Sequence, residues 1–371
     1  MPLKEKENSP VGKNKSSVGY MVHLDGIRAF AVGGVILEHW GSGLPGALPA
    51  IVGSLDLGGL GVECFFVLSG FLITLILLDS KDKNLPFRKA LGHFYTRRVL
   101  RIFPPYYATL LLTLLIFPQM HEVYAWHALY LSDLYPLWHG TFTPIGGHFW
   151  TLSVEEQFYL FWPLLVLVLP IRNIMYLALV LCLFAPLSRL ALWYFMGGTN
   201  LSMWSFPTTA LDLLCFGAFL ACMKHQTGLP VDGRFMRGFR IVGLVALLAY
   251  GVGYSQFEGT LTFAVLGRTF AALLFGALIV HAAHGFKGSV KWVLGNKTIV
   301  WIGTISYGLY IFHPFIPMAY LLVLKSLGLG RDIFGVYYIR YPLMTVTLLG
   351  VTAASFYFLE RPIRSFRKYF A

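Results

Sequence analysis

Charged side chains are scarce in this sequence, and this sets it apart from ordinary soluble proteins. Asp, Glu, Lys and Arg make up 12% of the 371 residues, against roughly 25% in a typical soluble domain. Hydrophobic residues make up 57%, and apolar runs of about 17 to 22 residues, each long enough to span a bilayer, recur along the chain. A soluble core of similar composition is the alternative, and the repeated runs argue against it. The sequence therefore predicts an all-α, polytopic integral membrane protein without a separate soluble domain.

Cysteine is scarce as well. The chain has four, Cys64, Cys182, Cys215 and Cys222, and each falls within an apolar run. Their spacing matches neither a metal knuckle nor a disulfide framework. We therefore expect them to pack as small apolar residues, and we expect no metal site.

The apolar runs predict about ten transmembrane helices in one domain. Residues 1–21 lack the apolar stretch and the cleavage site of a signal peptide, so we expect a disordered cytoplasmic tail followed by an uncleaved first span. Residues 22–371 then form the transmembrane domain. The predicted spans are residues 24–40, 58–78, 102–117, 147–169, 174–195, 207–223, 239–256, 262–283, 298–318 and 342–359.

Acidic residues are fewer than basic ones, which gives a formal net charge of +12. Such a charge suits nucleic acid, but here the Lys and Arg residues follow the predicted topology. With the N-terminus inside, only Lys325, Arg331 and Arg340 lie in external segments, which is a strong positive-inside signal. We therefore expect both termini in the cytoplasm, a lipid bilayer as partner, and no nucleic acid.

The first predicted span carries charge where apolar residues are expected. Asp25 and Arg28 lie near its start, and Glu38 and His39 lie near its end. The interval from Arg28 to His39 is about three helical turns and roughly 16 Å, so both side chains share one face. Charged groups inside a membrane usually face a cavity or a partner. The alternative is that Arg28 extends to lipid head groups and His39 lies at the outer interface.

Two further spans, the third and the fourth, carry polar clusters. Arg97, Arg98 and Arg101 lie at the predicted inner end of the third span, where guanidiniums suit phosphate; a membrane anchor is the alternative. The fourth span contains a pair of carboxylates, Glu155 and Glu156, of which Glu155 could pair with a cation or orient a histidine. His148, seven residues before Glu155, is close to the same helical face. The alternative is an interfacial carboxylate pair.

The ninth and fifth spans add the remaining polar candidates. Ser306, Tyr310 and His313 share one helical face, next to prolines that bend or open a helix. A packing role is the alternative for this histidine. A buried salt bridge can join Arg189 to Asp212, or Arg189 to Glu155.

Taken together, these motifs resemble the acyltransferase-3 family of bacterial membrane O-acyltransferases, from about residue 22 to 368. The resemblance implies about ten spans in a bacterial inner membrane. It also implies transfer of an acyl group, expected to be acetyl, from acyl-CoA to a hydroxyl of a cell-envelope or exported glycan. The motifs that carry it are "LDGIRA", "GVECFFVLSGFLIT", "RRVLRIFPPYY", "FWTLSVEEQFYLFWP", "SYGLYIFHP" and "ERPIR".

The family's motifs transfer to this sequence by position. Its arginine-to-histidine motif falls on Arg28 and His39, its paired arginines on Arg98 and Arg101, and its Ser-Val-Glu-Glu motif on Ser153–Glu156. Phe71 stands where tyrosine is common. Some members carry a further C-terminal hydrolase-like domain, which we expect this chain to lack.

The resemblance implies a mechanism. Cytoplasmic acetyl-CoA or another acyl-CoA would be bound by Arg98 and Arg101, with Arg97 and Arg28 assisting. His39 would accept the proton of the acceptor hydroxyl. Either Glu155 or Glu38 would orient that ring, Tyr310 or Ser306 would donate to the oxyanion, and His313 completes the catalytic candidates.

Several alternatives stay open at this point. A covalent acyl-enzyme is an alternative to direct transfer. A transporter or a flippase of a lipid-linked sugar would also place Arg, Glu and His inside spans, although the two halves of the chain show no repeat. A structural or regulatory membrane subunit is the third class. The sequence leaves the acceptor, the acyl chain length and the oligomeric state open.

Overall fold

Every regular element is a helix in the part of the chain that the computed structural model describes, residues 20–41, 44, 48–196, 201–228, 233–328 and 337–369. This confirms the all-α class. The predicted tail lies almost wholly outside these residues. The long helices are α1 (Val22–Gly41), α3 (Leu57–Asp82), α4 (Phe87–Ile116), α7 (Trp150–Val168), α8 (Ile171–Met196), α10 (Leu211–Thr227), α11 (Gly233–Phe257), α12 (Leu261–His284) and α17 (Tyr337–Ala354).

Short helical elements connect the long helices or extend them. They are α2 (Leu48–Ser54), α5 (Met120–Ala128), α6 (Tyr135–His139), η1 (Gly147–Phe149), α9 (Ser202–Ser205), η2 (Pro207–Ala210), α13 (Gly288–Leu294), α14 (Lys297–Thr304), α15 (Ser306–Phe312), α16 (Phe315–Ser326), the π-helical turn η4 (Ser355–Glu360), α18 (Arg361–Ser365) and η5 (Phe366–Tyr369).

The helices make this a multi-pass membrane protein. Among the described residues, seven helical segments are long and apolar enough to cross a membrane, or up to eight if the bent pair α15 and α16 forms one span. The helices α1 and α7 are not among them, because their charged motifs lower their apolar character. The count of ten and the cytoplasmic placing of both termini stay predictions.

Two predicted spans have different bounds in the structure. The third was expected at residues 102–117, but α4 begins at Phe87, so the arginine motif lies within a helix instead of at its end. Arg and Lys are good helix formers, so the helix extends beyond the apolar run. The ninth, expected at 298–318, is broken at Ile305 and again after Phe312, and α15 and α16 meet at 43°. Pro314 lies at the second break, as the sequence indicated.

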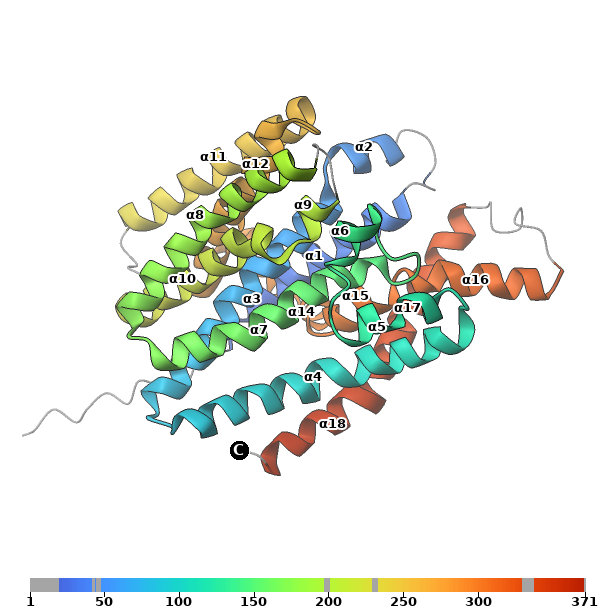
Figure 1. Cartoon of the computed structure of the whole chain (residues 1–371), viewed down its shortest axis with the longest axis horizontal. Coiled ribbons are helices and arrows are strands. Elements are labelled where there is room, and N and C mark those ends of the chain that lie inside the picture. The colour runs from blue at the N-terminus through green and yellow to red at the C-terminus, as the bar shows by residue number, and fades with distance from the viewer. Residues whose placement is uncertain are drawn as a thin grey trace, which may run out of the picture.

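Helix α3 runs through the middle of the bundle and packs against α1, α7, α10 and α12 (Figure 1). Its contact with α10 depends on glycine. A Cβ atom on Gly70 would lie 1.8 Å from the carbonyl oxygen of Leu214, and one on Gly217 would lie 2.1 Å from that of Val67. Such close backbone approach through small residues is typical of helix packing in membranes.

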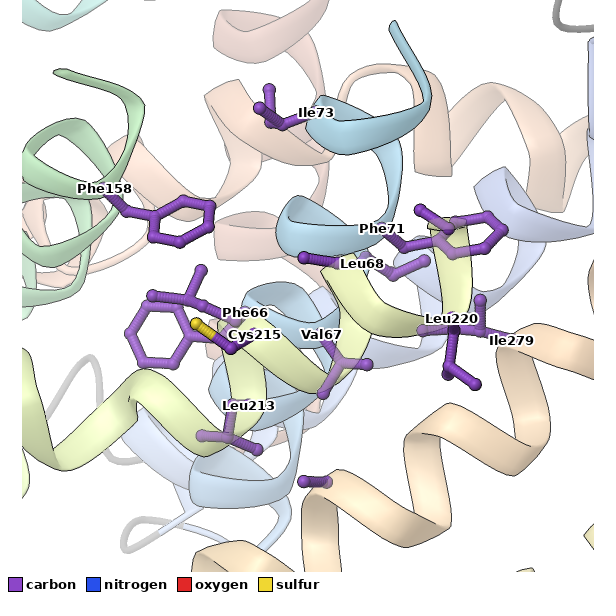
Figure 2. Packing of buried hydrophobic residues seen from close by; sticks show 14 of the residues in the cluster. Phe66, Val67, Leu68, Phe71, Ile73, Phe158, Leu213, Cys215, Leu220 and Ile279 are labelled. Carbon is purple, nitrogen blue, oxygen red and sulfur yellow. The ribbon is translucent and has the colours of Figure 1, made fainter. Parts of the chain in front are cut away.

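Apolar side chains fill the space around this contact, as Figure 2 shows. Phe66, Leu68 and Phe71 of α3 are fully buried. Cys215 of α10 packs in the same cluster, and the four cysteines are free thiols. The expectation that the cysteines act as apolar packing residues is met here. The central helices α3 and α10 therefore form a rigid support for the polar site.

Candidate active site

Three adjoining cavities lie among the polar motifs. We call them the arginine cavity, of about 230 Å³, the central cavity, of about 260 Å³, and the histidine cavity, of about 340 Å³. The arginine and central cavities share Arg98 and Arg101 in their walls. The central and histidine cavities share Val62 and Tyr310. The three cavities therefore form a series.

The arginine cavity gathers cations from two elements far apart in sequence. Helix α4 supplies Arg97, Arg98 and Arg101, while α18 and η5 supply Arg364 and Arg367. Arg364 and Arg367 were not predicted for the site, because only tertiary packing brings these residues to α4. Five guanidiniums around one cavity make an anion-binding site.

Aromatic rings position one of these arginines. The Arg98 guanidinium lies 5.1 Å from the ring centroid of Tyr159 and 5.7 Å from that of Phe94. Among the described residues, no carboxylate forms an ion pair with Arg98 or Arg101. Their hydrogen-bond donors are therefore not consumed by an acidic partner within the protein.

The central cavity brings the first helix and the arginine motif together. Arg28 of α1 lines it with Arg98 and Arg101. Arg28 forms an ion pair with Asp25 at 2.9 Å, and the Tyr20 hydroxyl donates to the other oxygen of Asp25 at 2.7 Å. Asp25 thus orients Arg28 at the start of α1. Arg28 therefore shares the central cavity with the paired arginines.

Glu155 also faces the central cavity, together with Glu156. Ser69 donates a hydrogen bond of 2.5 Å to Glu155, and the Tyr159 hydroxyl donates to Ser69 at 2.8 Å. The expectation that Glu155 orients His39 is therefore corrected. Glu155 faces the central cavity with Arg98, whereas His39 faces the histidine cavity. The reason is that Glu155 lies more than one helical turn after the start of α7.

His39 is oriented by a second histidine instead. The Nδ1 atom of His39 lies 2.8 Å from Nε2 of His313, and the Nδ1 atom of His313 lies 2.7 Å from the carbonyl oxygen of Tyr310. The Trp40 indole donates to the carbonyl oxygen of His313 at 3.1 Å. The break between α15 and α16 thus brings His313 against the end of α1.

This hydrogen-bond chain fixes the protonation of both neutral rings. A carbonyl oxygen only accepts, so Nδ1 of His313 carries the proton and its Nε2 accepts. Nδ1 of His39 must then donate to His313, which leaves Nε2 of His39 as a free acceptor. His39 lines the histidine cavity. A histidine held in this tautomer beside a cavity is suited to act as a general base.

The hydroxyl of Tyr310 is already engaged. It lies 2.7 Å from Oγ1 of Thr151 and donates to the carbonyl oxygen of His148 at 3.0 Å. Ser306 lines the central cavity beside it. The Tyr310 ring therefore forms part of the wall between two cavities, and its proton points toward His148 instead of into either cavity.

His148 is a third histidine at the site and was not among the residues predicted for it. It lines the histidine cavity, its ring lies 5.3 Å from that of His313, and its Nε2 donates to the carbonyl oxygen of Ile311 at 3.2 Å. The signal in the sequence was its spacing of seven residues from Glu155, which places both close to one face of a helix. Within the described ranges, no group of three His, Cys, Asp or Glu side chains is arranged to hold a metal ion.

Comparison with known proteins places this site in a family. Residues 21–361 match the model of the acyltransferase domain. Because the match covers most of the chain, the protein belongs to this acyltransferase family. No solved structure matches it.

Named relatives narrow the comparison. The chain is 28% identical to the peptidoglycan O-acetyltransferase OatA of Listeria monocytogenes, over 93% of this chain and 56% of the relative. It is 28% identical to the putative peptidoglycan O-acetyltransferase YrhL of Bacillus subtilis, over 93% and 55%. It is also 28% identical to the O-acetyltransferase OatA of Staphylococcus aureus, over 93% and 57%. The chain thus spans little more than half the length of these relatives.

Proposed function

We propose that this protein is an O-acyltransferase that moves an acetyl group from cytoplasmic acetyl-CoA to a hydroxyl of a cell-envelope glycan. The observation that carries the proposal is the hydrogen-bonded pair of His39 and His313 beside the wall that separates two cavities. The central cavity adjoins the arginine cavity, whereas the histidine cavity does not. The names of the relatives support acetyl as the group and a glycan as the acceptor.

The donor enters at the arginine cavity. Arg97, Arg98 and Arg101 bind the phosphates of acyl-CoA, with Arg364 and Arg367 on the opposite wall. Arg28 assists from the central cavity, which accommodates the pantetheine arm. The thioester then lies near Tyr310, where the central cavity meets the histidine cavity. The positive-inside signal supports a cytoplasmic position for this end of the protein.

The reaction is a direct transfer in this proposal. The acceptor hydroxyl gives its proton to Nε2 of His39 while its oxygen bonds to the carbonyl carbon of the thioester. The C–S bond breaks, and the leaving CoA thiolate takes up the proton from Nε2 of His39, which restores the neutral imidazole. His313 accepts the hydrogen bond from Nδ1 of His39 throughout, so it stabilises the imidazolium that forms.

Glu155 acts on the donor side. It accepts the hydrogen bond of Ser69, and both line the central cavity with Arg98. Glu155 thereby holds the wall along which the pantetheine arm lies. Tyr310 is a positioning residue in this scheme, because its hydroxyl is bonded to Thr151 and the His148 carbonyl.

The test measures thiol release from acetyl-CoA by the purified protein, with soluble de-O-acetylated peptidoglycan fragments as acceptor. We expect His39→Ala to lower acceptor-dependent release by about 10²–10⁴-fold, the range for loss of a general base. The matched control is His121→Ala, an exposed histidine on α5, which should leave the rate unchanged. Acceptor-dependent release that His39→Ala does not lower would contradict the proposal. A flippase would release no CoA at all.

A further inference from the structure

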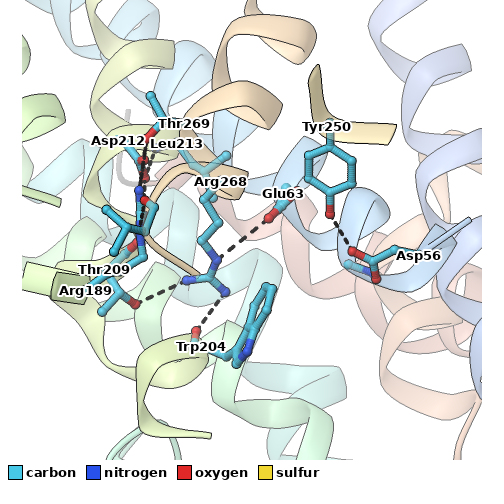
Figure 3. Close-up of polar contacts among 12 residues, drawn as sticks. Asp56, Glu63, Arg189, Trp204, Thr209, Asp212, Leu213, Tyr250, Arg268 and Thr269 are labelled. Atoms are coloured by element: carbon cyan, nitrogen blue, oxygen red, sulfur yellow. Dashed lines mark hydrogen bonds and ion pairs between the residues drawn. The ribbon is translucent and has the colours of Figure 1, made fainter. Parts of the chain in front are cut away.

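A second polar cluster lies where α3, α10 and α12 meet, and it contains two ion pairs of different character (Figure 3). Arg189 and Asp212 form the first, as the sequence analysis considered. Arg189 donates to both oxygens of Asp212, at 3.1 and 2.7 Å, and also to Val265, Thr209 and Thr269. This pair is saturated with hydrogen bonds within the protein.

The second pair, Glu63 and Arg268, is not saturated. Their closest atoms, Oε1 and Nε, are 3.7 Å apart, which is too far for a hydrogen bond. Among the described residues, neither oxygen of Glu63 nor Nε of Arg268 has a hydrogen-bond partner, although all three atoms are buried. Burying such groups unpaired is costly, so they call for an explanation.

Other contacts hold Arg268 firmly in place. Its two terminal nitrogens donate to Oγ1 of Thr209 at 3.2 Å and to the carbonyl oxygen of Trp204 at 2.8 Å. Its guanidinium also lies over the rings of Trp204 and Trp150, at 4.9 and 5.8 Å. The Nε atom lies on the side of Glu63 and has no hydrogen-bond partner among the described residues.

The unsaturated pair belongs to the histidine cavity. Glu63 and Arg268 line this cavity together with His39, and Trp150 and Trp204 contribute aromatic walls. Tyr250 does not donate a hydrogen bond to Glu63, because its hydroxyl donates to Asp56 instead. The unsaturated pair therefore borders the same cavity as the histidine to which we assign the general base.

The pair has the chemistry to bind a sugar hydroxyl. A hydroxyl donates one hydrogen bond and accepts others, so it can donate to Glu63 and accept from Nε of Arg268. Two neighbouring hydroxyls can divide these roles. A secondary amide fits less well, because its N–H and C=O are fixed in opposite directions. The indole rings of Trp150 and Trp204 suit the apolar face of a pyranose.

We propose that Glu63 and Arg268 form a sugar-recognition subsite that binds a hydroxyl of the acceptor other than the one acylated. This inference rests on the proposed function, and it adds the residues that select the acceptor. By holding a second hydroxyl, the pair determines which hydroxyl faces His39. Glu63 and Arg268 are specificity residues, because neither touches the reacting atoms.

The test measures binding of two probes, cellopentaose and de-O-acetylated peptidoglycan fragments, by saturation-transfer NMR without acetyl-CoA. We expect Glu63→Gln to weaken binding of at least one probe about tenfold, because an NH₂ group that only donates replaces one of the two carboxyl oxygens. Trp204→Phe keeps the backbone carbonyl that anchors Arg268 and should weaken binding severalfold. The matched control is Thr269→Val, next to Arg268 on α12, which removes hydrogen bonds of the saturated pair and should change binding less than twofold.

The outcomes separate this inference from the proposed function. The subsite is refuted if each probe binds wild type and Glu63→Gln equally while the variant elutes as a folded protein. Absence of binding to both proteins counts as equal binding. Equal losses in Thr269→Val would also refute it, since the effect would then be one of general packing. Selective loss of binding in Glu63→Gln without any thiol release by wild type would keep the subsite and overturn the transferase.

Discussion

A backbone carbonyl decides which nitrogen of His313 carries a proton, and through it the tautomer of His39. The carbonyl of Tyr310 accepts from Nδ1 of His313, so Nε2 of His313 accepts from His39. The free nitrogen of His39 is then the one available in the histidine cavity. This order of hydrogen bonds is the physical basis for calling His313 a positioning residue and His39 the base.

Replacing His313 tests that order. We expect His313→Ala to lower kcat by roughly 10–100-fold with little change in either KM, because His39 loses the partner that fixes its tautomer. His313→Gln can place its side-chain oxygen near the position of Nε2 and should restore part of the rate. The measurement is steady-state thiol release. An equal loss in both variants, or a change in KM alone, would argue against a positioning role.

The arginine cavity gives a second prediction for single residues. Arg101→Ala should raise the KM for acetyl-CoA about tenfold or more, because a guanidinium facing the donor phosphates is lost. The difference from wild type should shrink at high salt, which screens exposed charges. The control is Arg172→Ala on α8, whose guanidinium lies over Tyr176 outside the three cavities. A KM that changes equally in both variants would contradict the binding role.

At the scale of elements, close helix contacts and two breaks in helices set the positions of the polar groups. The break around His313 directs this residue toward α1, and the glycines of α3 and α10 bring these two backbones together. The proline next to His313 made the break predictable from sequence. The pairing of His39 with His313 was not predictable, because these residues are 274 positions apart and only packing brings them together.

The glycine contact can be tested with a matched pair. Gly217→Ala would place a Cβ atom 2.1 Å from the carbonyl oxygen of Val67, so α3 and α10 must move apart. Gly251→Ala on α11 meets nothing within 4 Å and gains roughly 1 kcal/mol of helix propensity. We expect the first to lower the unfolding temperature by roughly 5–10 °C and the second to leave it equal or higher. Thermal unfolding in detergent measures both, and equal effects would refute the close contact.

The cap of α3 gives a prediction about pH. Asp56 precedes α3, accepts from the amide of Gly59 at 3.2 Å, and has a left-handed backbone with φ 45°. Burial raises the pKa of Asp56 to about 6, against about 3.9 in the unfolded chain. At pH values between these two pKa values, the folded state binds more protons than the unfolded state. The free energy of unfolding therefore falls as the pH rises from about 4 to about 6.

Asp56→Asn isolates this effect, because Asn also caps helices and tolerates the left-handed conformation. The unfolding temperature of the variant should lack this part of the pH dependence. The difference in unfolding temperature, variant minus wild type, should therefore increase by roughly 2–4 °C when the pH is raised from 4 to 7. Parallel pH profiles for the two proteins would show that Asp56 is not responsible.

For the whole molecule, the sequence predicted the class of fold and most of the polar groups. Of their partners it offered Arg189 and Asp212 as a pair, but not the partners of Glu155 or His39. Charge scarcity and apolar runs indicated an all-α membrane protein, and the motif spacing indicated Arg28, His39 and the paired arginines. Sequence spacing could not show that Glu155 bonds to Ser69 on the donor side. Nor could it show that Arg364 of the last helices joins the arginine cavity, because such contacts depend on tertiary packing.

The proposed function has a direction of transfer along the three cavities, from a donor on the cytoplasmic face to a glycan on the other face. The most direct test uses sealed membrane vesicles of known sidedness, with radiolabelled acetyl-CoA on the cytoplasmic face and peptidoglycan fragments on the opposite face. We predict that label appears on the glycan with wild type and not with His39→Ala. Label that reaches the glycan only when both substrates share one face, or that persists in His39→Ala, would contradict the account.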